Sequence, residues 1–146
     1  MTDTIARLED RLKTVPPRLV DFSEAAVTHK PAPDRWSKKE LLGHLIDSAT
    51  NNHQRFVRAQ SVPRLEFPGY EQEFWVATQA YASEAWPDLV NLWLLLNRHL
   101  LHVVKAMPPE VLSHECVIGK NPPVTLEALI VDYLRHMDHH LTQLLG

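Results

Sequence analysis

The chain has 146 residues, of which 45% are hydrophobic and 23% charged, and its formal net charge is −3. This length fits one folded domain spanning residues 1–146, and the apolar content is too high for a disordered chain. Because no basic block occurs along the sequence, we expect no nucleic-acid partner.

Three further features of the sequence set expectations about location and ligand class. The longest apolar run, Leu92–Leu96, is far shorter than the roughly 20 residues of a membrane helix, so we expect no membrane partner. Met1–Asp10 lacks the basic flank and apolar centre of a signal peptide, and the single Cys116 has no partner for an internal disulfide, so we expect a cytoplasmic protein. None of the four glycines belongs to a glycine-rich phosphate loop.

Clusters of prolines divide the sequence into segments with apolar residues at helical spacing. The first segment, Thr4–Ala26, is predicted to be helical, with a kink or a restart at Pro16–Pro17. The second helix is predicted to begin at Ser37, because Ser37 and Glu40 have the spacing of a capping box. It is expected to run to about Gln60.

The remaining elements follow in chain order. Residues 61–81 carry turn-forming residues and are predicted to be irregular, with a short helical patch at Gln72–Gln79. The third helix is predicted over Pro87–Met107 and has a wide apolar face. A turn-rich stretch follows, in which a short hairpin is only weakly indicated. The fourth helix is predicted to begin at Thr125, a suitable N-cap, and to run to the C-terminus.

Four amphipathic helices and no predicted sheet indicate an all-α fold, specifically a four-helix bundle. The connection after the second helix, about Ser61–Trp86, is longer than a tight turn requires. The second and third helices could therefore run parallel rather than antiparallel.

The histidines of the last helix have the spacing of metal ligands. His136 and His140 lie four residues apart, so they share one face of the helix and can hold one metal ion between them. A stable transition-metal site needs three or four ligands, so a third donor must come from another helix. His44 is the best candidate because it lies beside the apolar stripe of the second helix. The same flank carries further polar residues, as in a pocket wall: Ser48, Asn51 and Arg55.

Two alternatives stay open for these histidines. An inward imidazole is more often a hydrogen-bonded core residue than a ligand, but three clustered neutral imidazoles without a metal would leave polar groups unpaired at about 1–3 kcal/mol each. His139 adjoins His140 and could approach the same ion. We favour His140 because positions i and i+4 lie about 40° apart around a helix, compared with about 60° for i and i+3.

Other candidate residues have weaker patterns. His99 and His102 are expected to be structural or at the surface, and Cys116 has no base beside it that would make it a nucleophile. Asp47 and Asp132 each lie within one turn of a proposed ligand and are candidates to orient an imidazole N–H or a bound water, with a solvated carboxylate as the alternative. The remaining histidines lack a partner at helical spacing: His29, His53 and His114. Three aromatic residues of the long connection can line a pocket mouth or cap the core: Tyr70, Phe74 and Trp75.

Two segments resemble a known family. Trp36–Asp47, with the sequence WSKKELLGHLID, and His136–Gln143, with the sequence HMDHHLTQ, are similar to segments of the DinB/YfiT-like superfamily. The resemblance implies a four-helix bundle in which His44, His136 and His140 bind a divalent metal, Zn²⁺ or Ni²⁺. It also implies a homodimer. Characterised members include transferases that use low-molecular-weight thiols, alongside proteins described as metal-dependent hydrolases.

The predicted ligand set bears on the reaction. Three protein ligands leave a metal ion with an open coordination position, as in catalytic sites. A small thiol there would be held as its thiolate for S-transfer to an electrophile, whereas water there would supply hydroxide for hydrolysis. The His136–His140 pair lacks the glutamate of the H-E-x-x-H motif, which favours thiol transfer over hydrolysis. A third hypothesis is a non-catalytic helical interaction module with packed histidines.

Overall fold

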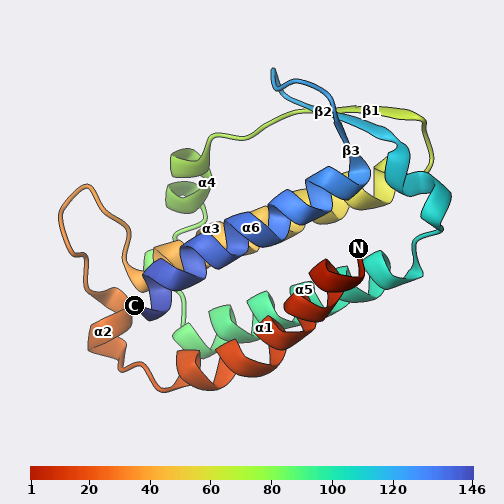
Figure 1. Cartoon of the computed structure of the whole chain (residues 1–146). Helices are drawn as coiled ribbons and strands as arrows, with labels where there is room; N and C mark the ends of the chain where they lie inside the picture. Colours follow the sequence, from red (N-terminus) through yellow and green to blue (C-terminus); the bar gives the residue numbers. More distant parts are fainter.

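Four long helices packed side by side make up most of the molecule, which is a four-helix bundle as predicted (Figure 1). The computed structural model describes residues 1–146. The long helices are α1 (Thr2–Val20), α3 (Lys38–Ala59), α5 (Trp86–Ala106) and α6 (Leu126–Leu145). The short elements are α2 (Glu24–Thr28), α4 (Gln72–Thr78), the 3-10 helices η1 (Tyr81–Ser83) and η2 (Pro109–Ser113), and the strands β1 (Arg64–Phe67), β2 (Glu115–Ile118) and β3 (Val124–Thr125). None of the helices has the length and hydropathy needed to cross a membrane.

The first helix passes through its two prolines without a break. A proline removes one backbone N–H from the helical ladder, but its backbone angle is compatible with a helix. Pro16 and Pro17 each remove one hydrogen bond from α1, but Val15 and Leu19 on either side of them are buried in the core, and the helix continues to Val20. The predicted restart at these prolines is therefore wrong. A new helix, α2, begins after Ser23, whose hydroxyl oxygen accepts from the Ala26 N–H (3.1 Å).

Side-chain caps fix the starts of α3 and α6 at the predicted residues. The Ser37 hydroxyl accepts from the Glu40 N–H (3.3 Å), and the Glu40 carboxylate accepts from the Ser37 N–H (3.1 Å), which completes a capping box. The Thr125 hydroxyl accepts from the Ala128 N–H (3.1 Å). These bonds satisfy N–H groups that a helix start otherwise leaves without partners. Because each start is fixed, so is the face on which every later residue of the helix lies.

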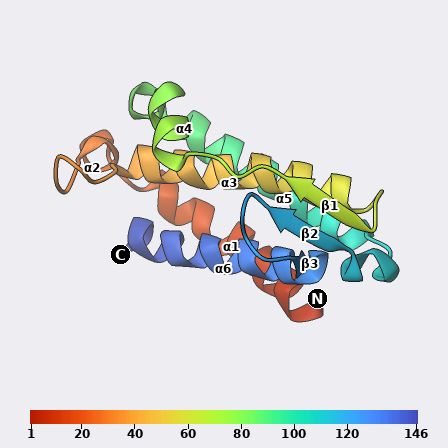
Figure 2. The ribbon, with the colours of Figure 1, turned by 90° about the horizontal axis from the view of Figure 1, so that it is seen from above.

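A small three-stranded sheet covers one end of the bundle, contrary to the expectation of a fold without a sheet (Figure 2). β1 pairs in parallel with β2, with Arg64 opposite Glu115 and Phe67 opposite Ile118. β2 pairs antiparallel with β3, which is the weakly indicated hairpin. The parallel partner of β1 lies about fifty residues away along the chain, so local sequence patterns carried no signal for it.

The long connection after α3 returns the chain to the end of the bundle where α3 begins. As a result α3 and α5 run in the same direction, while α1 and α6 run in the opposite one (Figure 1, Figure 2). The parallel arrangement that the length of residues 61–86 allowed is the one observed. The connection contains β1, α4 and η1, so it is more ordered than predicted.

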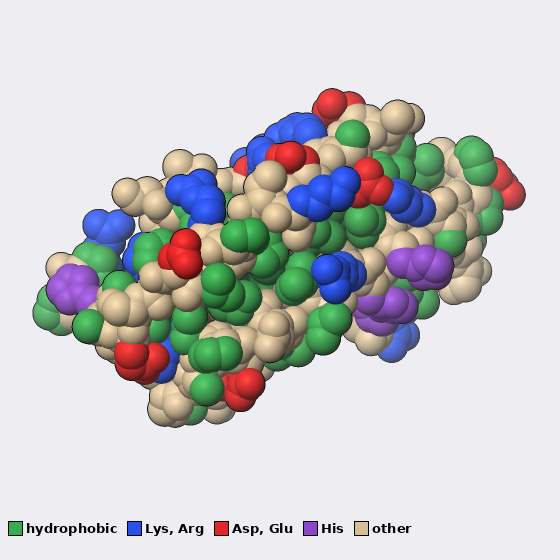
Figure 3. Space-filling model, turned by 90° about the horizontal axis from the view of Figure 1, so that it is seen from below, with side chains coloured by type: hydrophobic (Ala, Val, Ile, Leu, Met, Phe, Trp, Pro, Cys, Tyr) green, Lys and Arg blue, Asp and Glu red, His purple; other side chains and the backbone are tan.

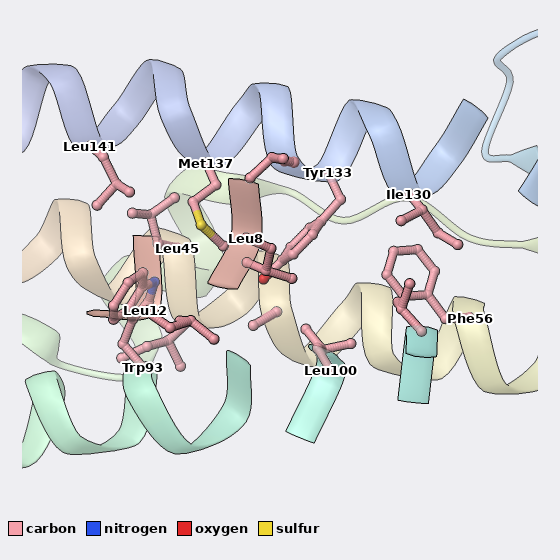
Figure 4. Close-up of a cluster of buried hydrophobic side chains, with 14 of the residues drawn as sticks. Leu8, Leu12, Leu45, Phe56, Trp93, Leu100, Ile130, Tyr133, Met137 and Leu141 are labelled. Atoms are coloured by element: carbon pink, nitrogen blue, oxygen red, sulfur yellow. The ribbon is translucent and has the colours of Figure 1, made fainter. Parts of the chain in front are cut away.

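The core is formed by apolar side chains from all four long helices (Figure 4). The labelled residues that point toward one another are Leu8 and Leu12 of α1, Leu45 and Phe56 of α3, Trp93 and Leu100 of α5, and Ile130, Tyr133, Met137 and Leu141 of α6. The Tyr133 hydroxyl donates to the side-chain oxygen of Asn97, whose amide donates to the Trp93 carbonyl (2.8 Å). Because Met137 is fixed in this core, its neighbours on α6 flank the apolar stripe.

Gly43 allows an aromatic ring to lie directly on α3. A Cβ atom at this position would lie 2.2 Å from Cδ2 and 2.3 Å from Cγ of Tyr81, far inside van der Waals contact. The ring is held there because the Tyr81 hydroxyl donates to the Asp47 carboxylate (2.7 Å), one turn further along α3. Gly43 therefore serves close packing of η1 against α3 rather than helix flexibility.

We expect Gly43→Ala to destabilise the protein. Alanine improves helix propensity by about 1 kcal/mol, but overpacking a fixed ring costs about 1–3 kcal/mol and here also breaks the Tyr81–Asp47 hydrogen bond. Thermal unfolding measures the net effect, and a lower melting temperature is the expected result. Gly69→Ala is the matched control, because nothing lies within 4 Å of a Cβ at Gly69. Equal melting temperatures for the two variants would contradict this account.

Candidate metal centre

The structure brings the three predicted histidines together between α3 and α6. One ring nitrogen from each of His44, His136 and His140 lies within 4.8 Å of the others. The Nε2 atoms of His44 and His136 are 3.1 Å apart. The ring centroids are separated by 5.0 Å for His44 and His136, 4.8 Å for His44 and His140, and 4.6 Å for His136 and His140. The three rings thus form a compact triangle.

Neighbouring side chains hold the imidazoles in this arrangement. The Trp36 ring, just before the cap of α3, packs against His44 with 4.9 Å between ring centroids. His140 Nδ1 lies 2.9 Å from the side-chain oxygen of Gln143, so Nδ1–H donates and the lone pair is on Nε2. An imidazole that donates through one nitrogen presents the other as a ligand. Gln143 was not identified from the sequence, although its position three residues after His140 is the available signal.

Burial keeps the cluster uncharged at neutral pH. Burial, together with the neighbouring His136 and His140, lowers the pKa of His44 to about 3. Burial, with a smaller contribution from His140, lowers the pKa of His136 to about 4. The pKa of His140 is lowered as well, chiefly by burial. Only neutral imidazoles can donate a lone pair to a metal ion, so all three are in the ligand form at pH 7.

The donor set fits a divalent transition metal. Two imidazole nitrogens that bind one ion at about 2.0–2.1 Å in tetrahedral geometry lie about 3.3 Å apart, close to the separation of His44 and His136. His44 is fully buried, and its Nδ1 has no hydrogen-bond partner. Without a metal ion, one of the two facing Nε2 atoms must donate a hydrogen bond to the other. That hydrogen bond uses only His44 and His136 and leaves the approach of His140 unexplained. Nitrogen ligands suit zinc and nickel alike.

The two candidate carboxylates form no hydrogen bond with the cluster histidines, although the charge of Asp132 acts to raise the pKa of His136 against the effect of burial. Asp47 is buried, and one of its oxygens accepts from the Tyr81 hydroxyl (2.7 Å) and from the Gln79 amide (2.7 Å). Burial raises the pKa of Asp47 in spite of these bonds. Asp132 is exposed and accepts from the Arg135 guanidinium. Neither carboxylate accepts a hydrogen bond from an imidazole of the cluster. The structure therefore does not support the expectation that Asp47 or Asp132 orients a ligand imidazole.

Of the other histidines, His139 lies beside the cluster, with its ring centroid 5.0 Å from that of His140, but it is exposed and does not belong to the converging group of three. His99 and His102 on α5 are exposed as well, and exposed histidines appear at both ends of the face shown in Figure 3. His53 packs against His99, with ring centroids 5.1 Å apart, a partner from another helix that spacing along one helix could not show. Cys116 is buried, and burial raises the pKa of its thiol, which keeps it protonated and unreactive.

A cavity of about 290 Å³ opens beside the cluster at His136. Its α3 wall contains Ser48 and Arg55, as predicted, but Asn52 takes the place expected for Asn51. Asn51 instead donates to the Asp47 carbonyl (2.9 Å). The opposite wall comes from the connections and α6: Gly69, Tyr70, Gln72, Ile118, Asn121, Leu129, Asp132 and Tyr133. Tyr70 is thus the one predicted aromatic that lines this cavity.

A second hollow of about 390 Å³ is lined by Trp36 and Gln143, the residues that contact His44 and His140, but by no histidine of the cluster. The cavity at His136 therefore offers the direct approach to the candidate metal centre.

Comparisons with known proteins agree with this fold. The family model of the DinB superfamily matches residues 5–144. Among solved structures, YfiT from Bacillus subtilis, described as a probable metal-dependent hydrolase with an unusual four-helix bundle topology, has a TM-score of 0.80 and 17% identity and covers 99% of this chain and 87% of its own. The DinB-like protein YjoA from Bacillus subtilis has a TM-score of 0.68 and 18% identity, over 97% of this chain and 86% of its own. No curated protein sequence matches the chain. At these identities the structural likeness concerns the fold alone, whereas the family match spans nearly the whole sequence, and the chain belongs to the DinB superfamily.

Proposed function

We propose that the protein is a metal-dependent enzyme in which His44, His136 and His140 hold one divalent ion, Zn²⁺ or Ni²⁺. The observation that carries the proposal is the convergence of three neutral imidazoles from two helices, one buried and two half-buried, with their nitrogens within 4.8 Å of one another. Three protein ligands leave a coordination position open, which is characteristic of catalytic rather than structural sites.

We further propose that the ion activates a low-molecular-weight thiol, whose sulfur then attacks an electrophile and forms a bond to it. A divalent ion in this site would stabilise a thiolate at neutral pH. No carboxylate base is hydrogen-bonded to the cluster, because Asp47 accepts from Tyr81 and Gln79, and Asp132 accepts from Arg135. Activation of water usually needs such a base, whereas a metal-bound thiol needs none. Burial by Trp36 keeps His44 neutral and ready to bind.

Metal-dependent hydrolysis is the second candidate. It is favoured by the similarity to YfiT, which is described as a probable metal-dependent hydrolase. The same three histidines would then hold the ion that activates water. The expected homodimer and cytoplasmic location are further parts of this proposal, and they do not bear on the choice between the two reactions.

We expect the purified protein to contain about one metal ion per chain. Elemental analysis measures this directly, and chelation should lower the melting temperature because the ion binds only the folded state. His44→Ala, His136→Ala and His140→Ala should each lose the ion. His139→Ala, which removes an exposed histidine of the same helix, should retain it. Absence of metal, together with a melting temperature that chelation leaves unchanged, would instead support an interaction module.

The two reactions can be separated by their requirement for a thiol. We expect the metal-loaded protein to accelerate the reaction of a cellular thiol with a generic electrophile, as measured by loss of free thiol. His136→Ala should abolish the acceleration, while His139→Ala should not. Turnover of esters or amides with no thiol present would instead establish hydrolysis.

We expect the metal-free protein to lose stability as the pH falls from 7 to about 4.5. The unfolded chain binds protons at its histidines near the ordinary pKa of about 6.5, whereas the folded pKa values of His44 and His136 are about 3 and about 4. Below pH 6.5 the unfolded state therefore binds more protons, and stability falls until the folded pKa values are reached. Thermal unfolding of chelated protein measures this loss. His44→Gln should lose less stability over this pH range than the wild type. An equal loss in both proteins would show that His44 does not cause the pH dependence.

A further inference from the structure

Arg55 is a buried cation without an acidic partner. Its side chain lies in α3 at 7% relative exposure, and its Nε–H is buried with no hydrogen-bond partner. Two aromatic rings lie beside it, with Cζ 5.7 Å from the centre of the Phe67 ring and 5.9 Å from that of Tyr70. By contrast, Arg11 on α1 pairs with Asp138 (2.7 Å). An unpaired charge at this depth lowers stability, so folding alone does not account for Arg55.

The Arg55 side chain lines two adjoining cavities. One is the cavity of about 290 Å³ that begins at His136, and the other, of about 380 Å³, reaches Cys116. The first follows α3 from Ser48 to Arg55, a distance of about 10 Å along the helix axis. Both cavities contain Asn121, whose amide can assist in binding a polar group. One end of this space is therefore the metal centre, and the other end is a guanidinium.

We propose that Arg55 binds a carboxylate of the substrate, at the end of the cavity remote from the metal centre. Guanidinium and carboxylate match as paired donors and acceptors, and a pair of this kind removes the uncompensated charge. The substrate is then a small organic acid whose reacting group lies near His136. This inference rests on the proposed function only in placing the reaction at the His136 end of the cavity.

The charges around the cavities favour a carboxylate over a phosphate. A phosphate monoester carries a charge of about −1.5 to −2 at pH 7, but Arg55 is the only lysine or arginine that lines either cavity. Asp132 lies at the same cavities, and its carboxylate is already bound to Arg135. The single positive charge of Arg55 is balanced by the single negative charge of a carboxylate, but not by the larger charge of a phosphate. Tyr70 and Ile118 offer apolar contact to the methylene groups between the two ends of the substrate.

The alternative role for Arg55 is structural, as a cation stacked on the aromatic ring of β1. The two roles differ in their effect on stability. If Arg55 only supports β1, its loss lowers the melting temperature. If it is kept for a ligand, Arg55→Met replaces an unpaired buried charge with an apolar side chain of similar length and melts at or above the temperature of the wild type in the absence of ligand.

The direct test follows the Arg55 Nε–H signal in nitrogen-15 NMR spectra of the full chain as purified. The probes are butyrate, its neutral analogue butyramide, and inorganic phosphate. We expect butyrate to shift this signal in a saturable way and butyramide to leave it unchanged. Arg55→Met, followed by backbone signals of Asn121 and Tyr70, should weaken butyrate binding by about tenfold to a hundredfold. Arg58→Met is the matched control, because Arg58 also stacks on Phe67 (6.0 Å) but is exposed, and it should bind butyrate normally.

The remaining outcomes each count against the proposal. Butyrate binding of equal strength in the wild type and Arg55→Met would overturn it, and tighter binding of phosphate than of butyrate would overturn the assignment to a carboxylate. Butyrate could also bind the metal ion itself, and repeating the titration after chelation detects this. Such binding is lost with the ion and is unaffected by Arg55→Met. Metal content measured on the same samples separates the two hypotheses: metal-free protein that binds butyrate through Arg55 contradicts the proposed function and supports this inference.

Discussion

The approach of two imidazole nitrogens, His44 Nε2 and His136 Nε2, to 3.1 Å is the constraint around which the rest of the structure is arranged. Two lone pairs at this separation repel each other unless a proton or a cation lies between them. The rings are nevertheless held in place from outside, by Trp36 against His44 and by Gln143 on His140. Capped helix starts and a shared apolar core hold α3 and α6 at the spacing that makes this contact possible.

A polar seam therefore runs between α3 and α6 beside the apolar core. Burial acts on this seam in two ways, because it keeps the histidines neutral and leaves Arg55 charged without an acidic partner. Both effects reduce the stability of the folded chain. The side chains drawn in Figure 4 offset that loss by removing a large apolar surface from water. Polar groups retained at such a cost are typical of binding and catalytic sites.

Much of this arrangement could be predicted from the sequence, since it follows from local rules. The capping box at Ser37 and the cap at Thr125 fix the phase of α3 and α6, and with it the inward direction of His44 and of the His136–His140 pair. Features that depend on residues distant in the chain could not be predicted this way. The pairing of β1 with β2 and the packing of His53 on His99 are of this kind. The predicted restart at Pro16–Pro17 failed for another reason, because the buried side chains on either side of the prolines hold the helix in place across them.

The walls of the cavity come from two kinds of segment. The histidines and Arg55 come from regular helices inside the bundle, whereas Tyr70, Ile118 and Asn121 come from the two connections that the pairing of β1 with β2 ties together. Connecting segments accept insertions and substitutions far more readily than packed helices do. Substitutions in these connections can therefore change part of the cavity wall while the residues contributed by the packed helices stay in place. Divergence within the fold is accordingly expected to concentrate in these connections, even at the low identities that separate its members.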